Sequence, residues 1–84
     1  MKGNLVYWVR EGNERMRSLR LTVCSEKDSD VLSRGGLAEL RRLRAQRLVS
    51  EAEKQGARLS YRDLSLILLA SKSTLKRDFR SGRE

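Results

Sequence analysis

The sequence predicts an α+β fold, mainly α, in which an N-terminal antiparallel β-hairpin precedes a long helix and a helix-turn-helix. Two segments near the N-terminus are rich in β-branched, aromatic or alternating apolar residues, as strands are. Strong helix formers dominate the second half, where serines stand at the starts of two short apolar-periodic segments. We expect one compact domain, with the hairpin and a connector in residues 1–34 and three helices in residues 35–84.

The strands of the hairpin are predicted at residues 5–10 and 19–23. Between them stand a glycine and an asparagine, which tolerate the positive φ of a turn. Leu19, Leu21 and Val23 share one face of the second strand. Because an isolated hairpin is only marginally stable in water, this face needs a cover, and we expect the later helices rather than a second chain to supply it.

Trp8 and Tyr7, in the first predicted strand, have two alternative roles. Aromatic side chains on a sheet can stack on unpaired bases. They also bury large apolar areas, and Trp8 is the one tryptophan of the chain. We therefore expect one or both of these residues to fill the core.

A long helix is predicted at residues 37–55, with Gly56 as its C-terminal stop. Before it we expect a short helical turn at residues 28–33, ended by two glycines at 35 and 36. The apolar side chains of the long helix fall on two surfaces, one with Leu40 and Leu43 and the other with Leu37, Ala45, Leu48, Val49 and Ala52. One surface is expected to meet the C-terminal helices and the other the hairpin. A homodimer contact through Leu40 and Leu43, or through the hairpin, satisfies the same pattern.

Two short helices are predicted to follow. Ser60 and Asp63 have the spacing of a capping box, and Leu59 and Leu64 that of a hydrophobic staple, so one helix should begin at Ser60 and continue to about residue 68. Ser71 can cap a second helix over residues 72–80.

Composition restricts the functions that this chain can have. Its 84 residues carry a formal net charge of +8 with an isoelectric point near 10.6, which favours a polyanionic partner, above all nucleic acid. No apolar run reaches the roughly 18 residues of a membrane span, so we expect no membrane partner and a cytoplasmic, nucleoid-associated protein. Without histidine and with one cysteine, the chain lacks the commonest catalytic and metal-binding groups, so no enzyme activity, metal or cofactor is expected.

The last predicted helix carries the residues expected to read double-stranded DNA. If Leu75 and Phe79 pack inward, the outer side is rich in hydrogen-bond donors that suit base edges in the major groove. The expected base-reading residues are Lys72, Ser73, Lys76, Arg77 and Arg80. The expected phosphate contacts are Ser71, Thr74, Arg62, Arg41, Arg42 and Arg44.

Two resemblances support this interpretation. The segment SKSTLKRDF at residues 71–79 resembles the recognition helix of repressors of the deoxyribose-operon regulator class. Residues 42–80, especially EAEKQGARLSYRDL at 51–64, resemble domain of unknown function 1670, a largely archaeal family with a predicted helix-turn-helix. Both resemblances imply transcription-factor-like DNA binding rather than a reaction.

The chain departs from the repressor pattern at two points. Leu69 stands where such motifs usually carry a glycine, which implies either local strain or a differently built turn. The β-wing of the repressor class has no counterpart after residue 80, so any contact of a hairpin with DNA is expected from the N-terminal one.

The predicted function is therefore a DNA-binding transcriptional regulator, with two alternatives kept open. The hairpin and long helix could instead mediate assembly, with nonspecific affinity for RNA or DNA. The basic residues of the long helix could simply be solvated and form local pairs such as Arg47 with Glu51. Asp78, beside the basic face, is expected to orient Arg77 or another arginine.

Overall fold

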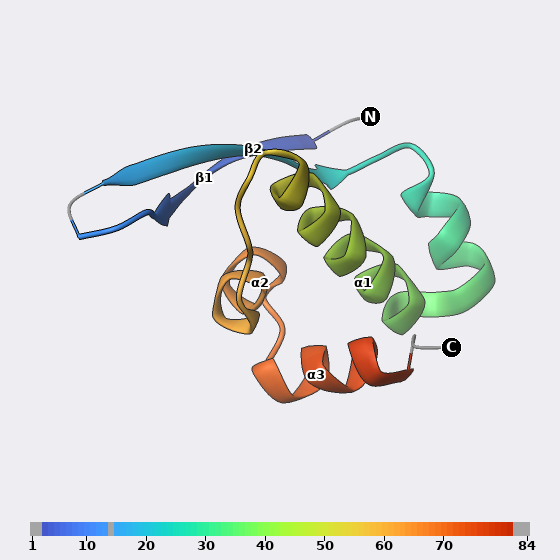
Figure 1. The fold of residues 1–84 in the computed structure, drawn as a ribbon. Coiled ribbons are helices and arrows are strands. Elements are labelled where there is room, and N and C mark those ends of the chain that lie inside the picture. Colours follow the sequence, from blue (N-terminus) through green and yellow to red (C-terminus); the bar gives the residue numbers. More distant parts are fainter. Residues whose placement is uncertain (1–2, 14, 82–84) are drawn as a thin grey trace.

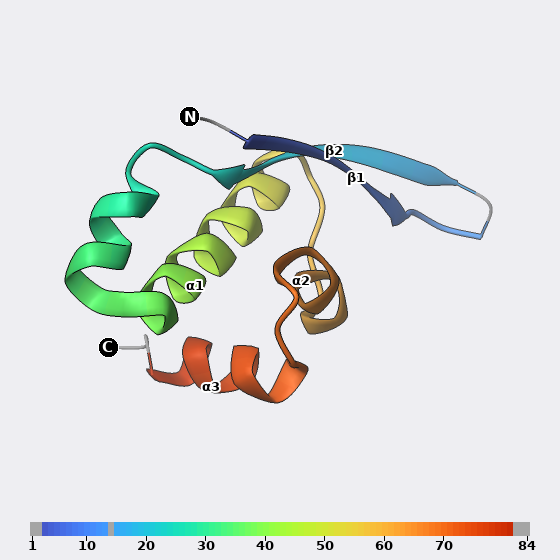
Figure 2. The same cartoon turned by 180° about the vertical axis from the view of Figure 1, so that it is seen from behind.

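Two antiparallel strands and three helices follow one another along the chain (Figure 1). The structure is a computed structural model that describes residues 3–13 and 15–81, with the backbone alone at residue 81. Its elements are β1 Gly3–Arg10, β2 Met16–Cys24, α1 Asp28–Lys54, α2 Tyr61–Leu68 and α3 Lys72–Ser81. The predicted α+β class, with a hairpin before three helices, is confirmed. Figures 1 and 2 show the sheet on one side of α1, and α3 on the opposite side.

The two strands pair in a register that buries one face of the sheet. Tyr7 lies opposite Leu19, and Leu5 opposite Leu21. Leu19 and Leu21 are completely buried, and α1 packs against β2, so the predicted cover by helices is confirmed. Both strands extend beyond the predicted ranges, because backbone pairing continues past the residues whose alternating hydropathy made them recognisable.

Polar side chains of α1 and of Gln55, which directly follows it, hydrogen-bond to backbone groups on the edge of β2 that does not pair with β1. Glu51 accepts from the Thr22 amide at 2.6 Å, and Gln55 accepts from the Arg20 amide at 2.9 Å. Gln55 also donates to the Arg20 carbonyl at 2.7 Å, and Arg47 donates to the carbonyls of Thr22 and Val23. These bonds align α1 along β2 and close an edge on which another strand would otherwise pair.

The first part of α1 agrees with the prediction in outline. The helix begins at Asp28 and bends at Gly36, whose φ of 80° and ψ of −174° interrupt the helical geometry. The predicted break is therefore present as a kink at Gly36, and the predicted helical turn before it forms the first part of the same helix. Asp28 explains why this segment docks: it is buried, and the guanidiniums of Arg44 and Arg47 each donate to it at 2.9 Å. Arg47 makes these contacts in place of the local pair with Glu51 that the alternative of a solvated helix includes.

The predicted division of the apolar residues of α1 is also corrected. Leu37 was placed with the main buried group but is 73% exposed, because it follows the kink at Gly36. Leu40 is buried within the chain, and Leu43 is half-buried. The buried position of Leu40 removes it from any surface available to a second copy.

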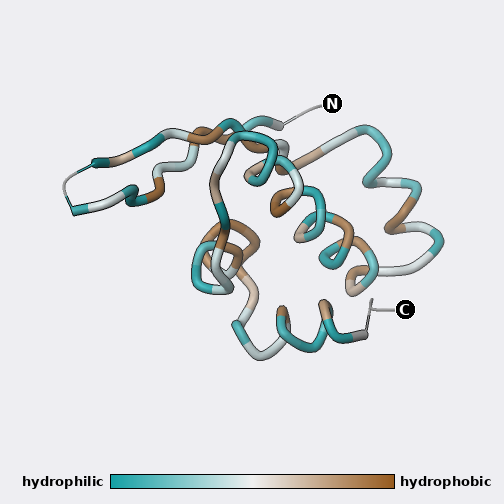
Figure 3. The backbone as a smooth tube through the Cα atoms, viewed as in Figure 1, coloured by the Kyte–Doolittle hydropathy of each residue, from teal (hydrophilic) through white to brown (hydrophobic). Residues whose placement is uncertain are grey.

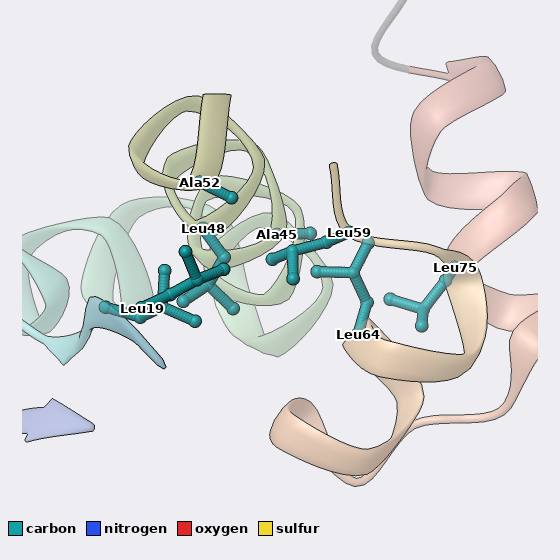
Figure 4. Close-up of a cluster of buried hydrophobic side chains, with 8 residues drawn as sticks. Leu19, Ala45, Leu48, Ala52, Leu59, Leu64 and Leu75 are labelled. Atoms are coloured by element: carbon teal, nitrogen blue, oxygen red, sulfur yellow. The ribbon is translucent and has the colours of Figure 1, made fainter. Parts of the chain in front are cut away.

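One continuous core joins the sheet to the helical pair (Figure 4). Figure 4 shows Leu19 from β2 meeting Leu48 on α1, and Leu64 and Leu75 approaching each other on the other side of α1. The buried members of this cluster are Leu19, Leu21, Ala45, Leu48, Ala52, Leu59, Leu64 and Leu75. Alanines at two of the α1 positions let neighbouring elements approach the helix closely.

The ends of α2 are defined by its caps. Ser60 and Asp63 form the predicted capping box: the Ser60 hydroxyl accepts from the Asp63 amide, and the Asp63 carboxylate accepts from the Ser60 amide. At the other end, Leu69 adopts the left-handed conformation, with φ 57° and ψ 41°, and its side chain is 90% exposed. The turn thus keeps the left-handed geometry usually given to glycine, with a leucine in its place.

Of the two aromatic residues of β1, Tyr7 fills the core as expected and Trp8 does not, since Trp8 is 57% exposed. The alternation along β1 places it on the outer face of the sheet. Tyr7, its neighbour, points inward and packs against the core.

No helix in the described part of the chain is both long and apolar enough to traverse a lipid bilayer.

Candidate nucleic-acid interface

The third helix divides sharply into an inner and an outer side. Leu75 is completely buried, and Asp78 and Phe79 also turn toward the rest of the fold. Figure 3 shows the hydrophobic parts of α3 toward α1 and the hydrophilic parts on the far side. The exposed residues are Lys72, Ser73, Lys76, Arg77 and Arg80, which are the predicted base-reading residues. We call these five residues the α3 outer face.

Asp78 is the one acidic residue in α3, and it does not lie on the outer face. Its carboxylate accepts from Nε of Arg41 at 2.5 Å and from Nη2 of Arg41 at 3.1 Å. This two-point hydrogen bond raises the pKa of Arg41 above its ordinary value. The partner of Asp78 is therefore an arginine of α1 rather than Arg77, and the α3 outer face contains cations and one serine.

Tyr61 supports the outer face from the start of α2. Its ring meets the ring of Phe79 edge to face, with centroids 5.9 Å apart and an angle of 69° between the planes. The ammonium of Lys76 lies 5.7 Å from the centre of the Tyr61 ring. Lys76 thus remains exposed while a cation–π contact holds its ammonium near the start of α2. This contact had no signal in the sequence, because it depends on how the two helices cross.

The N-terminus of α3 is capped by Ser71. The Ser71 hydroxyl accepts from the amide of Thr74 at 3.1 Å and donates to the Thr74 hydroxyl at 2.8 Å. These two predicted phosphate contacts therefore bond to each other. The Thr74 hydroxyl proton is not used in this pair and can still be donated outward.

Each predicted phosphate contact on α1 pairs with a carboxylate of the chain: Arg41 and Arg44 with buried aspartates, and Arg42 with a partly exposed glutamate of the same helix. Arg41 binds Asp78, Arg42 binds Glu39, and Arg44 binds Asp28. Pairing with a carboxylate neutralises each guanidinium and fixes its direction, so the structure does not join them to the α3 outer face as free cations. By contrast, Arg62 on α2 is exposed and makes no ion pair within residues 3–13 and 15–81.

A hydrogen bond from the hairpin steadies the start of α2. The Tyr7 hydroxyl donates to Asp63 at 2.6 Å. Burial, and then this hydrogen bond, raise the pKa of Tyr7 to about 12. Burial opposes ionisation of Asp63, but the hydrogen bonds from Tyr7 and Ser60 outweigh it and lower the pKa of Asp63. The capping carboxylate of α2 is therefore shared with the sheet.

The profile of one protein family, described as "Protein of unknown function (DUF1670)", matches residues 7–83. The chain belongs to the DUF1670 family. The match begins within β1 and continues past the last described residue, so the DUF1670 region includes the hairpin as well as the helical part, beyond the segment in which the sequence resemblance was noted. No curated protein and no solved structure matches this DUF1670 chain. Across its described residues, no three metal-ligating side chains gather into a cluster.

Proposed function

We propose that this DUF1670 protein binds double-stranded DNA and acts as a transcriptional regulator in the cytoplasm, associated with the nucleoid. The observation that carries the proposal is the α3 outer face, which combines four cations with a serine and has no acidic residue. Such a face attracts phosphates at long range and presents donors to base edges at short range. The chain's net charge of +8 acts in the same direction.

The arrangement of α2 and α3 supports entry of α3 into the major groove as the second helix of a helix-turn-helix. A two-residue connection, Leu69 and Ala70, and the cap at Ser71 separate the helices, and Leu64 and Leu75 close the core between them. Arg77 and Arg80 suit bidentate donation to guanine, and Lys72 suits either a base or a phosphate. Arg62, Ser71 and Thr74 remain the proposed phosphate contacts from the neighbouring surface.

The position of Asp78 favours this proposal over a merely solvated helix. Exposed helical faces that bind no charged ligand usually carry both acidic and basic side chains, because pairs of opposite charge stabilise the helix. In α3 the single carboxylate, that of Asp78, pairs with Arg41 on the inner side of the helix. The cations of the outer face have no carboxylate within ion-pair distance among the described residues. A polyanion would supply the missing negative charge.

The hairpin does not contribute to this proposed contact. In Figures 1 and 2 the sheet and α3 lie on opposite sides of the molecule, with α1 and α2 between them. A duplex docked on α3 therefore meets the α2–α3 side alone. The N-terminal hairpin takes no part as a wing.

The test removes charge from the centre of the α3 outer face. We expect the variant K76A/R77A to bind duplex DNA about tenfold more weakly or worse, and to lower the slope of log K against log salt by about 0.9 for each phosphate that the variant no longer neutralises. The matched control K27A/K54A removes two exposed lysines near the sheet and should change duplex affinity little. Gel-shift titrations at several salt concentrations measure both effects.

Equal binding by K76A/R77A and the parent protein would overturn the proposal, as would an equal loss in the control. Selection of bound sequences from a random duplex pool then measures specificity. An enriched motif is expected if the α3 outer face reads bases rather than phosphates alone.

A further inference from the structure

A second surface rich in both apolar and cationic side chains lies on the outer face of the sheet. Among the residues that the strand alternation exposes there are Val6, Trp8, Arg10, Met16, Ser18 and Arg20. Trp8 is 57% exposed, and Val6 and Met16 are each 56% exposed. We call these six residues the outer sheet face. An exposed tryptophan with two flanking apolar residues is unusual for a small domain and indicates a ligand.

The strand register places the cations beside the indole. Val6 lies opposite Arg20, Trp8 opposite Ser18, and Arg10 opposite Met16. Arg10 is therefore two residues along the strand from Trp8, about 7 Å away, and Arg20 is its diagonal neighbour. Small Ser18 directly opposite leaves one side of the indole open.

The whole sheet lacks negative charge. Neither β1, GNLVYWVR, nor β2, MRSLRLTVC, contains an aspartate or glutamate. Arg10 and Arg20 side chains have no carboxylate within ion-pair distance in the described part of the chain. An aromatic platform flanked by unpaired arginines has the chemistry to stack a base and hold the adjoining phosphates.

We propose that the outer sheet face binds single-stranded nucleic acid, with an unpaired base on Trp8 and neighbouring phosphates on Arg10 and Arg20. Bases in a duplex are stacked on each other, so a flat indole on a sheet can engage only an unpaired base. The ligand class is thus a single strand, of DNA or RNA, and the site is separate from the α3 outer face. It does not depend on whether α3 binds a duplex.

A second copy of the chain fits this surface less well. Face-to-face pairing of two outer sheet faces would bring arginines of both copies together, with no carboxylate on either face to offset them. Glu51 and Gln55 already occupy the edge of β2 at Arg20 and Thr22, which hinders pairing with a further strand there. Charge complementarity favours a polyanion.

Trp8 supplies its own signal for the test, since it is the only tryptophan of the chain. Titration of the protein with fifteen-residue oligomers of thymidylate and of uridylate should quench its emission as the base stacks. The two oligomers distinguish DNA from RNA, and binding of either supports the site.

Variants measured with a labelled oligomer give the second readout. We expect W8A to lose roughly 5-fold or more in affinity, the range typical of one stacked base, and W8F to retain most of it. R10A/R20A should lower the salt slope by about 0.7 for each phosphate left without its arginine. L66A is the matched control, because Leu66 is an equally exposed apolar residue on α2. Circular dichroism and urea unfolding verify that each variant folds.

To show that the two sites are independent, each variant is also tested for binding of the other site's ligand. K76A/R77A should keep its single-strand affinity, and W8A should keep its duplex affinity. The inference is overturned if oligomers leave Trp8 emission unchanged, or if W8A binds them as the parent does. It is also overturned if sedimentation shows a dimer that W8A dissociates, because a second copy then covers the outer sheet face.

Discussion

At the scale of single residues, two buried aspartates decide which arginines remain available for ligands. Asp28 accepts from Arg44 and Arg47, and Asp78 accepts from Arg41. A carboxylate in a partly buried site needs such partners, because its desolvation is costly when it is left alone. Arg41, Arg44 and Arg47 of α1 therefore hold the fold together, whereas the arginines of α3 and the outer sheet face stay unpaired among the described residues.

Ionisation of Asp28 makes the free energy of unfolding depend on pH in the acid range. Hydrogen bonds from Arg47 first, and from Arg44, overcome burial and lower the pKa of Asp28 to about 2, below the value of about 3.9 in an unfolded chain. Because the pKa of Asp28 is lower in the folded than in the unfolded chain, its ionised form stabilises the fold fully at pH values above the unfolded pKa. This stabilisation is lost as the pH falls from about 4 toward 2. At neutral pH the contribution is about 2 kcal/mol.

We therefore expect Asp28→Asn to lower the free energy of unfolding by about 2 kcal/mol or more at pH 7, because it leaves two guanidiniums without their charged partner. Urea unfolding at a series of pH values measures this, and the difference from the parent should shrink as the pH approaches 2. Asp30→Asn, at an exposed position in the same helical turn, is the control. A constant difference at every pH would contradict the assignment of the effect to ionised Asp28.

At the scale of elements, caps and kinks determine where the helices begin and end. The sequence predicted some of these boundaries better than others. The start of α2 followed from Ser60 and Asp63, because a capping box is a local interaction. In α1 the break predicted at the glycines is present as a kink at Gly36, but the continuation of one helix back to Asp28 was not predicted, because the contacts that hold its first turns come from residues 44 and 47. Local signals predict an element reliably only where distant contacts do not outweigh them.

The turn between α2 and α3 offers a test at this scale. Leu69 has a positive φ, which costs a residue with a Cβ about 1 kcal/mol or more, and its exposed side chain buries almost nothing. Leu69→Gly should therefore raise the free energy of unfolding by up to about 1 kcal/mol, the relief of strain exceeding the added freedom of the unfolded chain.

The matched control is Leu66→Gly, which changes another exposed leucine three residues earlier, inside α2. There φ is helical, so glycine should lower the free energy of unfolding by about 1 kcal/mol. Thermal unfolding of both variants measures the two opposite changes in the free energy of unfolding. Destabilisation in both would refute the claim that Leu69 is strained.

At the scale of the whole molecule, α1 is the layer that joins two candidate binding faces. Its buried side chains contact β2 on one side and the α2–α3 pair on the other, through a single core. The outer sheet face and the α3 outer face consequently point away from each other and are carried by one cooperative unit. A duplex on one face and a single strand on the other do not compete for the same space.

Because the core is shared, a cavity at its centre should loosen both faces together. Leu48 is completely buried between the sheet and the helices, so Leu48→Ala should lower the free energy of unfolding by about 2–5 kcal/mol. In an 84-residue chain that is a large part of the total stability. Leu37→Ala, at a residue that is largely exposed, should cost less than about 1 kcal/mol.

Trp8 emission reports the sheet and circular dichroism reports the helices during urea unfolding of Leu48→Ala. The two transitions should coincide and shift together to lower urea concentration. Separate transitions would show that the hairpin and the helical pair unfold independently, contrary to a single shared core.

The sequence by itself determined the class of the fold, the hairpin, the caps of the last two helices and the cationic side of α3. These features depend on periodicity and on contacts between residues close in the chain. Only the tertiary structure decided that Trp8 is exposed, that Leu40 is buried and that Asp78 withdraws to Arg41. Each of those outcomes depends on which surfaces distant segments cover, and no local pattern of residues records that choice.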